Sequence, residues 1–302
     1  MLKKSNILIF NIIKNFKENP HKKIIFDNKR SLTYSELIYS ALANSKKIKK
    51  INSKYIPIIV ERNVDSVIAI LAVLFSKKIF CPISHKFPID RIKQFLKILK
   101  TNHFINCSKK KFNIYNEHKI SFKSKEIKFD FDLTDSDKTF YLLFTSGSTG
   151  DPKGVKLSFN NIHNTLEWSR NYLDWKNHKI GIATEFSFDI SMFDLFSGLF
   201  FNVPSYIFSN PSDPFETLNE INNNKITSIF SVPTFFSNFI KFDLLKRKSS
   251  LKRIISGGDF FPPKDILLWK SDTSCEVINV WGPTETSIVN SMYKIKNKDI
   301  KN

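Results

Sequence analysis

The residues from 145 to 154 have the types and spacing of a loop that could bind a polyphosphate. They read Thr-Ser-Gly-Ser-Thr-Gly-Asp-Pro-Lys-Gly and follow the apolar segment Tyr141–Phe144. Gly147 and Gly150 allow backbone turns that point N–H groups into one concavity, while hydroxyls and Lys153 add donors and positive charge. No G-K-[ST] follows at the spacing of a Walker A loop. Gly/Ser/Thr clusters also occur in plain linkers, but the apolar strand in front of this one favours phosphate binding.

The segments that must position this loop alternate between strand-like and helix-like patterns. Tyr55–Val60 and Ile79–Ile83 predict buried strands, Asp65–Phe75 predicts a buried helix, and Pro88 predicts the start of a helix that ends near Leu99. The alternation continues with predicted strands at 180–184, 205–208, 226–231, 253–255 and 276–280, and helices at 189–200 and from 233. This order predicts an α/β fold with a mostly parallel sheet covered by helices.

The pattern is less regular near the N-terminus and in the middle of the chain. Apolar residues from Ile9 to Phe16 recur at helical spacing and predict a first helix that Pro20 closes. The stretch from Lys109 to about Lys138 is polar and has no clear period. We therefore expect surface hairpins or a connection there.

The composition argues against several classes of protein. Lys and Arg number 47 and Asp and Glu 28, for a net charge of +19, but the lysines are spread along the chain. No helix-turn-helix, zinc finger or RNP signature accompanies them, so no nucleic-acid partner is expected. Three distant cysteines without a C-x-x-C pair disfavour a disulfide scaffold or structural zinc. No apolar run approaches the ~20 residues that span a bilayer, and we expect a cytoplasmic protein without a membrane partner.

The loop at 145–154 resembles the signature of adenylate-forming, or AMP-binding, enzymes. These include acyl-CoA synthetases, luciferases and the adenylation domains of nonribosomal peptide synthetases. Further segments resemble the family's other blocks, in the right order: Leu32–Leu37 (L-T-Y-x-E-L), Leu71–Ile92, Phe188–Ser191 (F-D-x-S), Gly257–Asp259 (G-G-E) and Asn279–Glu285 (N-x-Y-G-P-T-E). The resemblance implies the large N-terminal domain of the adenylate-forming fold, with helix-flanked, mostly parallel sheets.

Some segments depart from the family's pattern. Ile83-Ser84-His85 stands where the family has L-D-P, and Asp259 replaces a Glu. A glycine that is usual near Ser76 is also missing. These departures indicate sequence drift.

The resemblance implies ATP and Mg²⁺ as cofactors. The family joins a carboxylic acid to the AMP part of ATP and releases pyrophosphate, a reaction that depends on positioning and charge neutralisation. Glu285 would bind Mg²⁺, and Thr284 would lie near the α-phosphate and the substrate carboxylate. The resemblance assigns the leaving pyrophosphate to Thr145, Ser146, Gly147, Ser148, Thr149, Gly150 and Lys153.

The resemblance also implies adenine contacts. Trp281 would stack on adenine in place of the family's usual Tyr, since indole has the larger π face. Asn279 and Gly257 would contact the adenine edge. The alternative for Glu285, an exposed loop acid without a ligand, stays open.

Asp189 decides the class of substrate that the resemblance implies. In the amino-acid-activating branch, the Asp of F-D-x-S binds the α-ammonium group, and a carboxylate in a buried place needs such a partner. Asp189 also begins an apolar helical run, so it could serve as a helix cap instead. Other positions transfer as pocket residues with an apolar or small character: Ile190, Phe193, Phe230, Ile254, Ser256, Val280, Ile288 and Val289. They predict a compact pocket for an uncharged side chain, as in peptide synthetase domains or in the D-alanine ligases of teichoic acid synthesis.

The family pattern stops after Glu285 in this sequence. We expect residues 1–302 to be an incomplete AMP-binding domain with subregions of about 1–140 and 141–302. Within residues 1–302 we recognise neither the ribose-binding Asp block nor the C-terminal lid with its catalytic Lys. Amino-acid activation could therefore need a separate chain that supplies the lid, and a carrier protein as acceptor. The alternative is a non-catalytic remnant that binds nucleotide or a partner.

Overall fold

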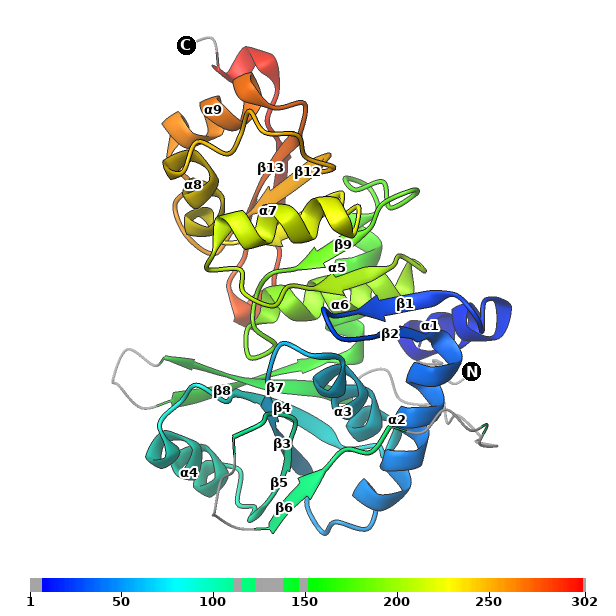
Figure 1. Ribbon diagram of the computed structural model, residues 1–302. Coiled ribbons are helices and arrows are strands. Elements are labelled where there is room, and N and C mark those ends of the chain that lie inside the picture. The colour runs from blue at the N-terminus through cyan, green and yellow to red at the C-terminus, as the bar shows by residue number, and fades with distance from the viewer. Residues whose placement is uncertain (1–6, 111–115, 123–125, 127–137, 147–151, 301–302) are drawn as a thin grey trace, which may run out of the picture. The chain divides into compact units, whose positions relative to one another are not determined.

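The computed structural model describes residues 7–110, 116–122, 126, 138–146 and 152–300. The chain divides into two compact units. Unit 1 comprises Met1–His163 and Glu185–Asp189, and unit 2 comprises Asn164–Thr184 and Ile190–Asn302. Each unit is built on strands with helices packed beside them, as the sequence predicts for an α/β fold (Figure 1). The expected domain boundaries stay a prediction.

Unit 1 is built around a six-stranded sheet in the order β6-β5-β3-β4-β7-β8. The strands are β3 (Tyr55–Val60), β4 (Ile79–Ser84), β5 (His103–Asn106), β6 (Asn116–Lys119), β7 (Thr139–Ser146) and β8 (Pro152–Ser158). All neighbours are parallel except β7 and β8. A separate antiparallel pair joins β1 (Lys23–Phe26) and β2 (Ser31–Thr33).

Local residues determine where the helices of unit 1 begin and end. They are α1 (Ile7–Glu18), α2 (Tyr34–Ile48), α3 (Val64–Phe75) and α4 (Ile89–Ile98). Thr33 and Glu36 form a capping box: the Glu36 N–H donates to Thr33 Oγ1 at 3.2 Å, and the Thr33 N–H donates to Glu36 Oε2 at 2.8 Å. The L-T-Y-x-E-L segment thus has a structural explanation. Helix α3 packs on β3 and β4 and is apolar and buried almost throughout.

One segment of unit 1 differs from the sequence-based expectation. The polar stretch after Lys109 contains β6, which pairs parallel to β5 and not as a surface hairpin with it. Its residues, Asn-Glu-His-Lys, show no apolar alternation because the strand lies at the edge of the sheet, where backbone pairing suffices.

Unit 2 contains strands in the order β14-β13-β12-β11-β9-β10. They are β9 (Ile180–Ile182), β10 (Ser205–Ile207), β11 (Ser228–Ser231), β12 (Arg253–Ser256), β13 (Glu276–Trp281) and β14 (Ser291–Lys294). Only β14 runs antiparallel to its neighbour. The helices are α6 (Asp189–Phe200), α7 (Pro214–Asn223), α8 (Pro233–Lys241) and α9 (Pro263–Asp272), with short 3₁₀ turns at η1 (Thr284–Thr286) and η2 (Asn297–Ile300). Helix α5 (Phe159–Ser169) contains the boundary between the units.

The helices of unit 2 show two features: three begin with proline, and one is buried along its length. Helices α7, α8 and α9 each start with Pro, which is favoured at the first helical position. Helix α6 is buried from Ile190 to Phe200, and α9 packs against β13 (Figure 1). Within the described residues, no helix has the length and hydropathy to cross a membrane.

Candidate functional site

The carboxyl ends of three parallel strands in unit 2 carry many of the residues that the sequence assigns to adenine and substrate. Ser256, the last residue of β12, pairs in register with Ser231 of β11 and Asn279 of β13. The Gly257 N–H then donates to the Ser231 carbonyl oxygen at 3.2 Å. Because parallel strands end at one edge, these positions come together although they are far apart in the sequence.

Some of the predicted substrate residues of unit 2 pack near one another at this edge. The rings of Phe193 and Phe230 meet edge to face with their centroids 5.6 Å apart. A Cβ added at Gly257 would lie 2.5 Å from Val280 Cγ2, so glycine is required there for the strands to pack. The role of the predicted substrate residues in binding a substrate stays a prediction. The buried residues of the predicted pocket are Ile190, Phe193, Phe230, Ile254, Ser256, Val280, Ile288 and Val289.

Two of these residues have features that ordinary core packing does not require. Ser256 is 0% exposed, and its Oγ has no hydrogen-bond partner among the described residues. Ile288 has a φ of 75° and follows Ser287 with a φ of 73°. A β-branched residue in this left-handed region costs on the order of 1–3 kcal/mol, and such strain concentrates at ligand sites.

Apart from Gly257, the predicted adenine and metal residues lie on β13 and the turn that follows. Asn279 and Trp281 are two residues apart, so they share one face of β13, and both are exposed, Trp281 by 66%. Val280 between them faces the buried side. Thr284 and Glu285 lie on η1, where Glu285 is exposed and Thr284 half-buried. These four residues are accessible to a ligand.

The predicted phosphate segment is a hairpin in unit 1 and not one continuous loop. Strand β7 continues through Ser146, β8 begins at Pro152, and Thr145 pairs directly with Lys153. The backbone pairing between β7 and β8 is uninterrupted from Leu143 to Ser146. Lys153 is exposed. Gly147, Ser148, Thr149 and Gly150 lie outside the described residues.

Asp189 is the first residue of α6 and is half-buried. Tyr141 on β7 is fully buried, and its pKa is raised well above its usual range, first by burial and then by the negative charge of Asp189. Asp189 therefore lies near the strand that ends at Ser146. The dipole of α6 favours a carboxylate at this position. Binding of an ammonium group and capping of the helix both stay predictions.

A group of polar residues in unit 1 was not anticipated from the sequence. Glu185 Oε2 accepts a hydrogen bond from Ser84 Oγ at 2.8 Å, and its Oε1 lies 2.6 Å from Lys86 Nζ and 3.8 Å from Arg62 Nη2. We call these four residues the Glu185 cluster. Burial alone would raise the pKa of Glu185, but Lys86, Ser84 and Arg62 outweigh it and hold that pKa below its usual value. The one available signal was Ser84, which replaces the acid of L-D-P.

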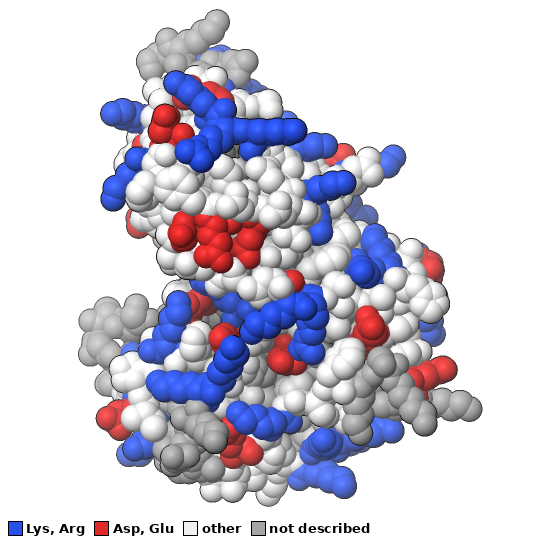
Figure 2. All heavy atoms as spheres, in the orientation of Figure 1, with Lys and Arg blue, Asp and Glu red and all other residues white. Residues whose placement is uncertain are grey.

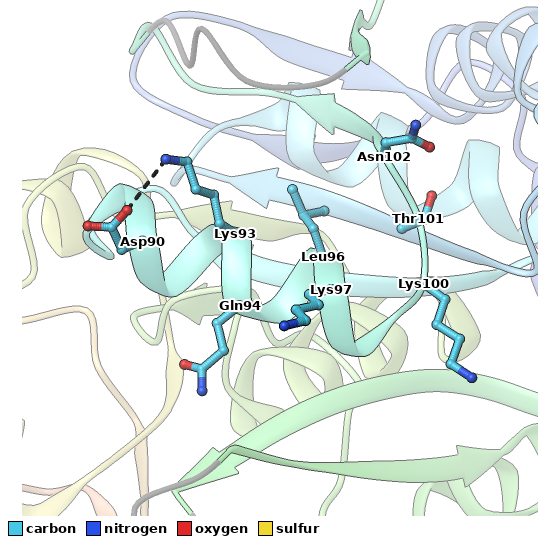
Figure 3. Close-up of a pocket in the computed structure, with 8 residues that line it drawn as sticks. All are labelled: Asp90, Lys93, Gln94, Leu96, Lys97, Lys100, Thr101 and Asn102. Carbon is cyan, nitrogen blue, oxygen red and sulfur yellow. Dashed lines mark hydrogen bonds and ion pairs between the residues drawn. The ribbon is translucent and has the colours of Figure 1, made fainter.

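A hollow described in unit 1 is lined by none of these residues. It has a volume of about 520 Å³ and is formed by α4 and the turn after it (Figure 3). Its rim carries Lys93, Lys97 and Lys100, and Lys93 pairs with Asp90 at 3.5 Å. Lysines and arginines are spread over the face seen in Figure 2, with acidic residues between them. In the part of the chain that the structure describes, no three His, Cys, Asp or Glu side chains gather as metal ligands.

Comparisons with known proteins agree with this arrangement of strands and helices. The N-terminal subdomain of NpsA from Klebsiella oxytoca superimposes with a TM-score of 0.84 at 18% identity, over 97% of this chain and 76% of that one. The adenylation domain AlmE of Vibrio cholerae superimposes with a TM-score of 0.81 at 19% identity, over 95% of this chain and 61% of that one. Both likenesses concern the fold.

Sequence relatives include peptide synthetases. Tyrocidine synthase 1 of Brevibacillus parabrevis is 28% identical over 289 residues, which are 90% of this chain and 26% of the relative. Gramicidin S synthase 1 of Brevibacillus brevis is also 28% identical, over 90% of this chain and 26% of the relative. The chain thus spans about a quarter of these relatives. A family model described as "AMP-binding enzyme" matches residues 13–301, and this chain therefore belongs to the AMP-binding enzyme family.

Proposed function

We propose that this chain activates an amino acid as an aminoacyl adenylate at the expense of ATP. The observation that carries the proposal is the burial of the mostly apolar pocket residues predicted in unit 2, in a chain of the AMP-binding family that also carries Asp189. An apolar pocket binds a side chain, and a carboxylate binds an α-ammonium group. Together these two features favour an amino acid over a fatty acid.

The reaction requires no covalent attachment to the protein. A carboxylate oxygen of the amino acid attacks the α-phosphorus of ATP, the bond from that phosphorus to the α,β-bridging oxygen breaks, and pyrophosphate leaves with the electron pair. In this proposal Lys153 and Thr145, with Ser146 and the segment from Gly147 to Gly150, bind the leaving pyrophosphate. Thr284 donates to the reacting phosphate and carboxylate oxygens. Such fixed donors act by stabilising charge that develops in the transition state.

Glu285 and the phosphates suit Mg²⁺. This ion takes hard oxygen ligands and is usually held by one or two carboxylates together with substrate phosphates. Glu285 is an exposed carboxylate, which agrees with that role. Mg²⁺ would neutralise phosphate charge, while Trp281 stacks on adenine and Asn279 and Gly257 contact its edge.

The pocket supports a small or apolar amino-acid side chain. Its members carry no charge, and the Ser256 hydroxyl, which has no partner among the described residues, would offer one hydrogen bond to a substrate. AlmE is described in complex with glycyl-adenosine-5'-phosphate, and a D-alanine ligase type of reaction also fits such a pocket. A carrier protein is a fitting acceptor, since PA1221 is described as containing both adenylation and PCP domains. A separate chain that supplies a lid is part of the same proposal, and neither a nucleic-acid nor a membrane partner is proposed.

Amino-acid-dependent exchange of labelled pyrophosphate into ATP tests the proposal. The chain is assayed with each common amino acid and with D-alanine, alone and with a lid domain added in trans. We expect exchange with one amino acid or a small set, and a loss of about 100-fold in Glu285→Gln. The matched control Asp243→Asn alters an exposed carboxylate of unit 2 and should leave exchange unchanged. Folded protein without exchange in either setting would favour the non-catalytic alternative.

A further inference from the structure

The Glu185 cluster concentrates charge in a partly buried place. The side chain of Glu185 is 17% exposed and that of Arg62 19%, whereas that of Lys86 is 63% exposed. Burial lowers the pKa of Arg62, and the negative charge of Glu185 opposes this shift. Two cations and a hydroxyl therefore converge on one carboxylate. Ion pairs on an open surface contribute little, but removing one partner of a shielded pair leaves an uncompensated charge.

Glu185 begins a five-residue segment that ends at Asp189. The segment Glu185–Asp189 belongs to unit 1, although Thr184 before it and Ile190 after it belong to unit 2. Its backbone closes into a turn, because the Phe188 N–H donates to the Glu185 carbonyl oxygen at 2.9 Å. Phe186 inside the turn is 1% exposed. A turn that is hydrogen-bonded and packed at its centre transmits the position of one end to the other.

We propose that Glu185 is a positioning residue for Asp189. Its side chain fixes the start of the turn to Ser84 at the end of β4 and to Arg62 after β3, and the turn then fixes Asp189 beside β7. This inference rests on the proposed function, because it concerns the carboxylate that would bind the α-ammonium group. Asp189 must lie within hydrogen-bond distance of that group, and a displacement of 1 Å is enough to weaken such a contact.

The sequence offers a second way to supply the same charge. In the segment that stands where the family has L-D-P, Ser84 occupies the acid's position, and its Oγ donates a hydrogen bond to the Glu185 carboxylate. The carboxylate that compensates Arg62 and Lys86 thus comes from residue 185 in this chain. A carboxylate moved to residue 84 should compensate the same cations, but it would no longer hold the start of the turn.

The test compares Glu185→Gln with the double variant Ser84→Asp/Glu185→Gln. For Glu185→Gln we expect the KM for the amino acid to rise about 10-fold, with the KM for ATP and kcat nearly unchanged. The double variant should recover thermal stability but not the KM for the amino acid. If charge compensation alone matters, both recover, and the positioning role is overturned. Lys86→Gln should give a smaller rise, since that side chain is mostly exposed.

Hydrogen exchange supplies a readout that does not depend on activity. In Glu185→Gln the Phe188 amide should exchange about 10-fold faster, while amides of β3 and β4 keep their protection. The matched control Glu167→Gln breaks an exposed pair with Arg170 in unit 2 and should change neither readout. Unchanged exchange at Phe188 would overturn the positioning role even if the wild-type chain activates amino acids. Faster exchange at Phe188 in a chain without pyrophosphate exchange would instead support the coupling and reject the proposed function.

Discussion

Unit 1 partly buries one charged side chain and unit 2 fully buries another, and the two units compensate these charges in different ways. Glu185 in unit 1 lies against two cations and a hydroxyl and keeps some contact with solvent. Arg253 in unit 2 is 1% exposed; its Nε donates to Ser228 Oγ and its Nη1 to the Asp174 carbonyl oxygen, both at 3.0 Å. This difference supports the proposal that Glu185 is a positioning residue, and it predicts that Arg253 contributes to the stability of the fold.

The surroundings of Arg253 support this distinction. Its guanidinium lies 5.0 Å from the centre of the Trp175 ring, and burial lowers its pKa to about 10 although Glu276 and Asp174 oppose the shift. Arg253 is the first residue of β12, and the predicted pocket residue Ser256 is the last. We therefore expect a substitution of Arg253 to lower the free energy of unfolding more than it weakens substrate binding.

The largest expected effect is that of Arg253→Ala on stability. The change removes packing and hydrogen bonds from a fully buried site, so we expect a loss of about 3–5 kcal/mol in the free energy of unfolding, measured by urea denaturation. Lys252→Ala, an exposed neighbour, should stay within about 0.5 kcal/mol. A loss below about 1 kcal/mol in Arg253→Ala would remove the contrast between the two units.

We expect a smaller effect from His178 in the same region, which should make the free energy of unfolding depend on pH. Its Nδ1 lies 3.0 Å from Thr227 Oγ1, and burial, followed by the charge of Arg253, lowers its pKa to about 4. The unfolded chain therefore binds more protons between its ordinary pKa of 6.5 and 4, so stability is full above this window and falls as the pH falls through it.

His178→Gln should flatten that dependence. Urea denaturation at a series of pH values from 7 to 4 measures the slope, and the exposed His21→Gln serves as the control. An unchanged slope in His178→Gln would show that other groups produce the acid sensitivity.

Glu185 should affect stability less than Arg253 does. We expect Glu185→Gln to cost about 1 kcal/mol at neutral pH, because the side chain is only partly shielded. The pKa of Glu185 is lowered in the folded state, so its contribution is present above the ordinary Glu range and is lost as the pH falls through the lowered value. Wild type and variant should therefore converge in acid, and parallel stability curves would contradict the ion-pair account.

The smallest expected effect is that of Lys86→Gln. Its ammonium group lies 2.6 Å from Glu185 Oε1, but the side chain is 63% exposed, so solvent can hydrate the charge. We expect a change within about 0.5 kcal/mol at moderate salt, by the same denaturation measurement. A loss as large as that of Glu185→Gln would mean that Lys86, and not Arg62, is the main partner.

The sequence predicts helices and strands well where a run of apolar residues defines them. Strand β3 and helix α6 have the predicted bounds, and α3 begins one residue earlier, because each is an apolar run with a clear end signal. Strand β6 was missed, since an edge strand of polar residues has no such pattern. Ser256 and Asn279 lie side by side because their parallel strands end at one edge, while the predicted pocket as a whole stays a prediction.

The interactions of charged residues could not be predicted in the same way. Glu185 and Ser84 are 101 positions apart, and nothing in either local pattern links them. The sequence predicts Arg253 only as the start of a short strand, because arginine side chains are mostly exposed in proteins and no local pattern signals burial. Such contacts depend on the register between distant segments, which a single sequence does not encode in its local periodicity.

The central claim, amino-acid activation through Asp189, is tested most directly by binding of stable aminoacyl sulfamoyl adenosines. Each compound is titrated calorimetrically into the 302-residue chain and compared with its counterpart that lacks the α-amino group. We predict that one amino compound binds about 10-fold or more tightly than its counterpart, and that Asp189→Asn abolishes this difference. Equal binding of the two compounds by the wild-type chain, or no binding of either by folded protein, would contradict the account.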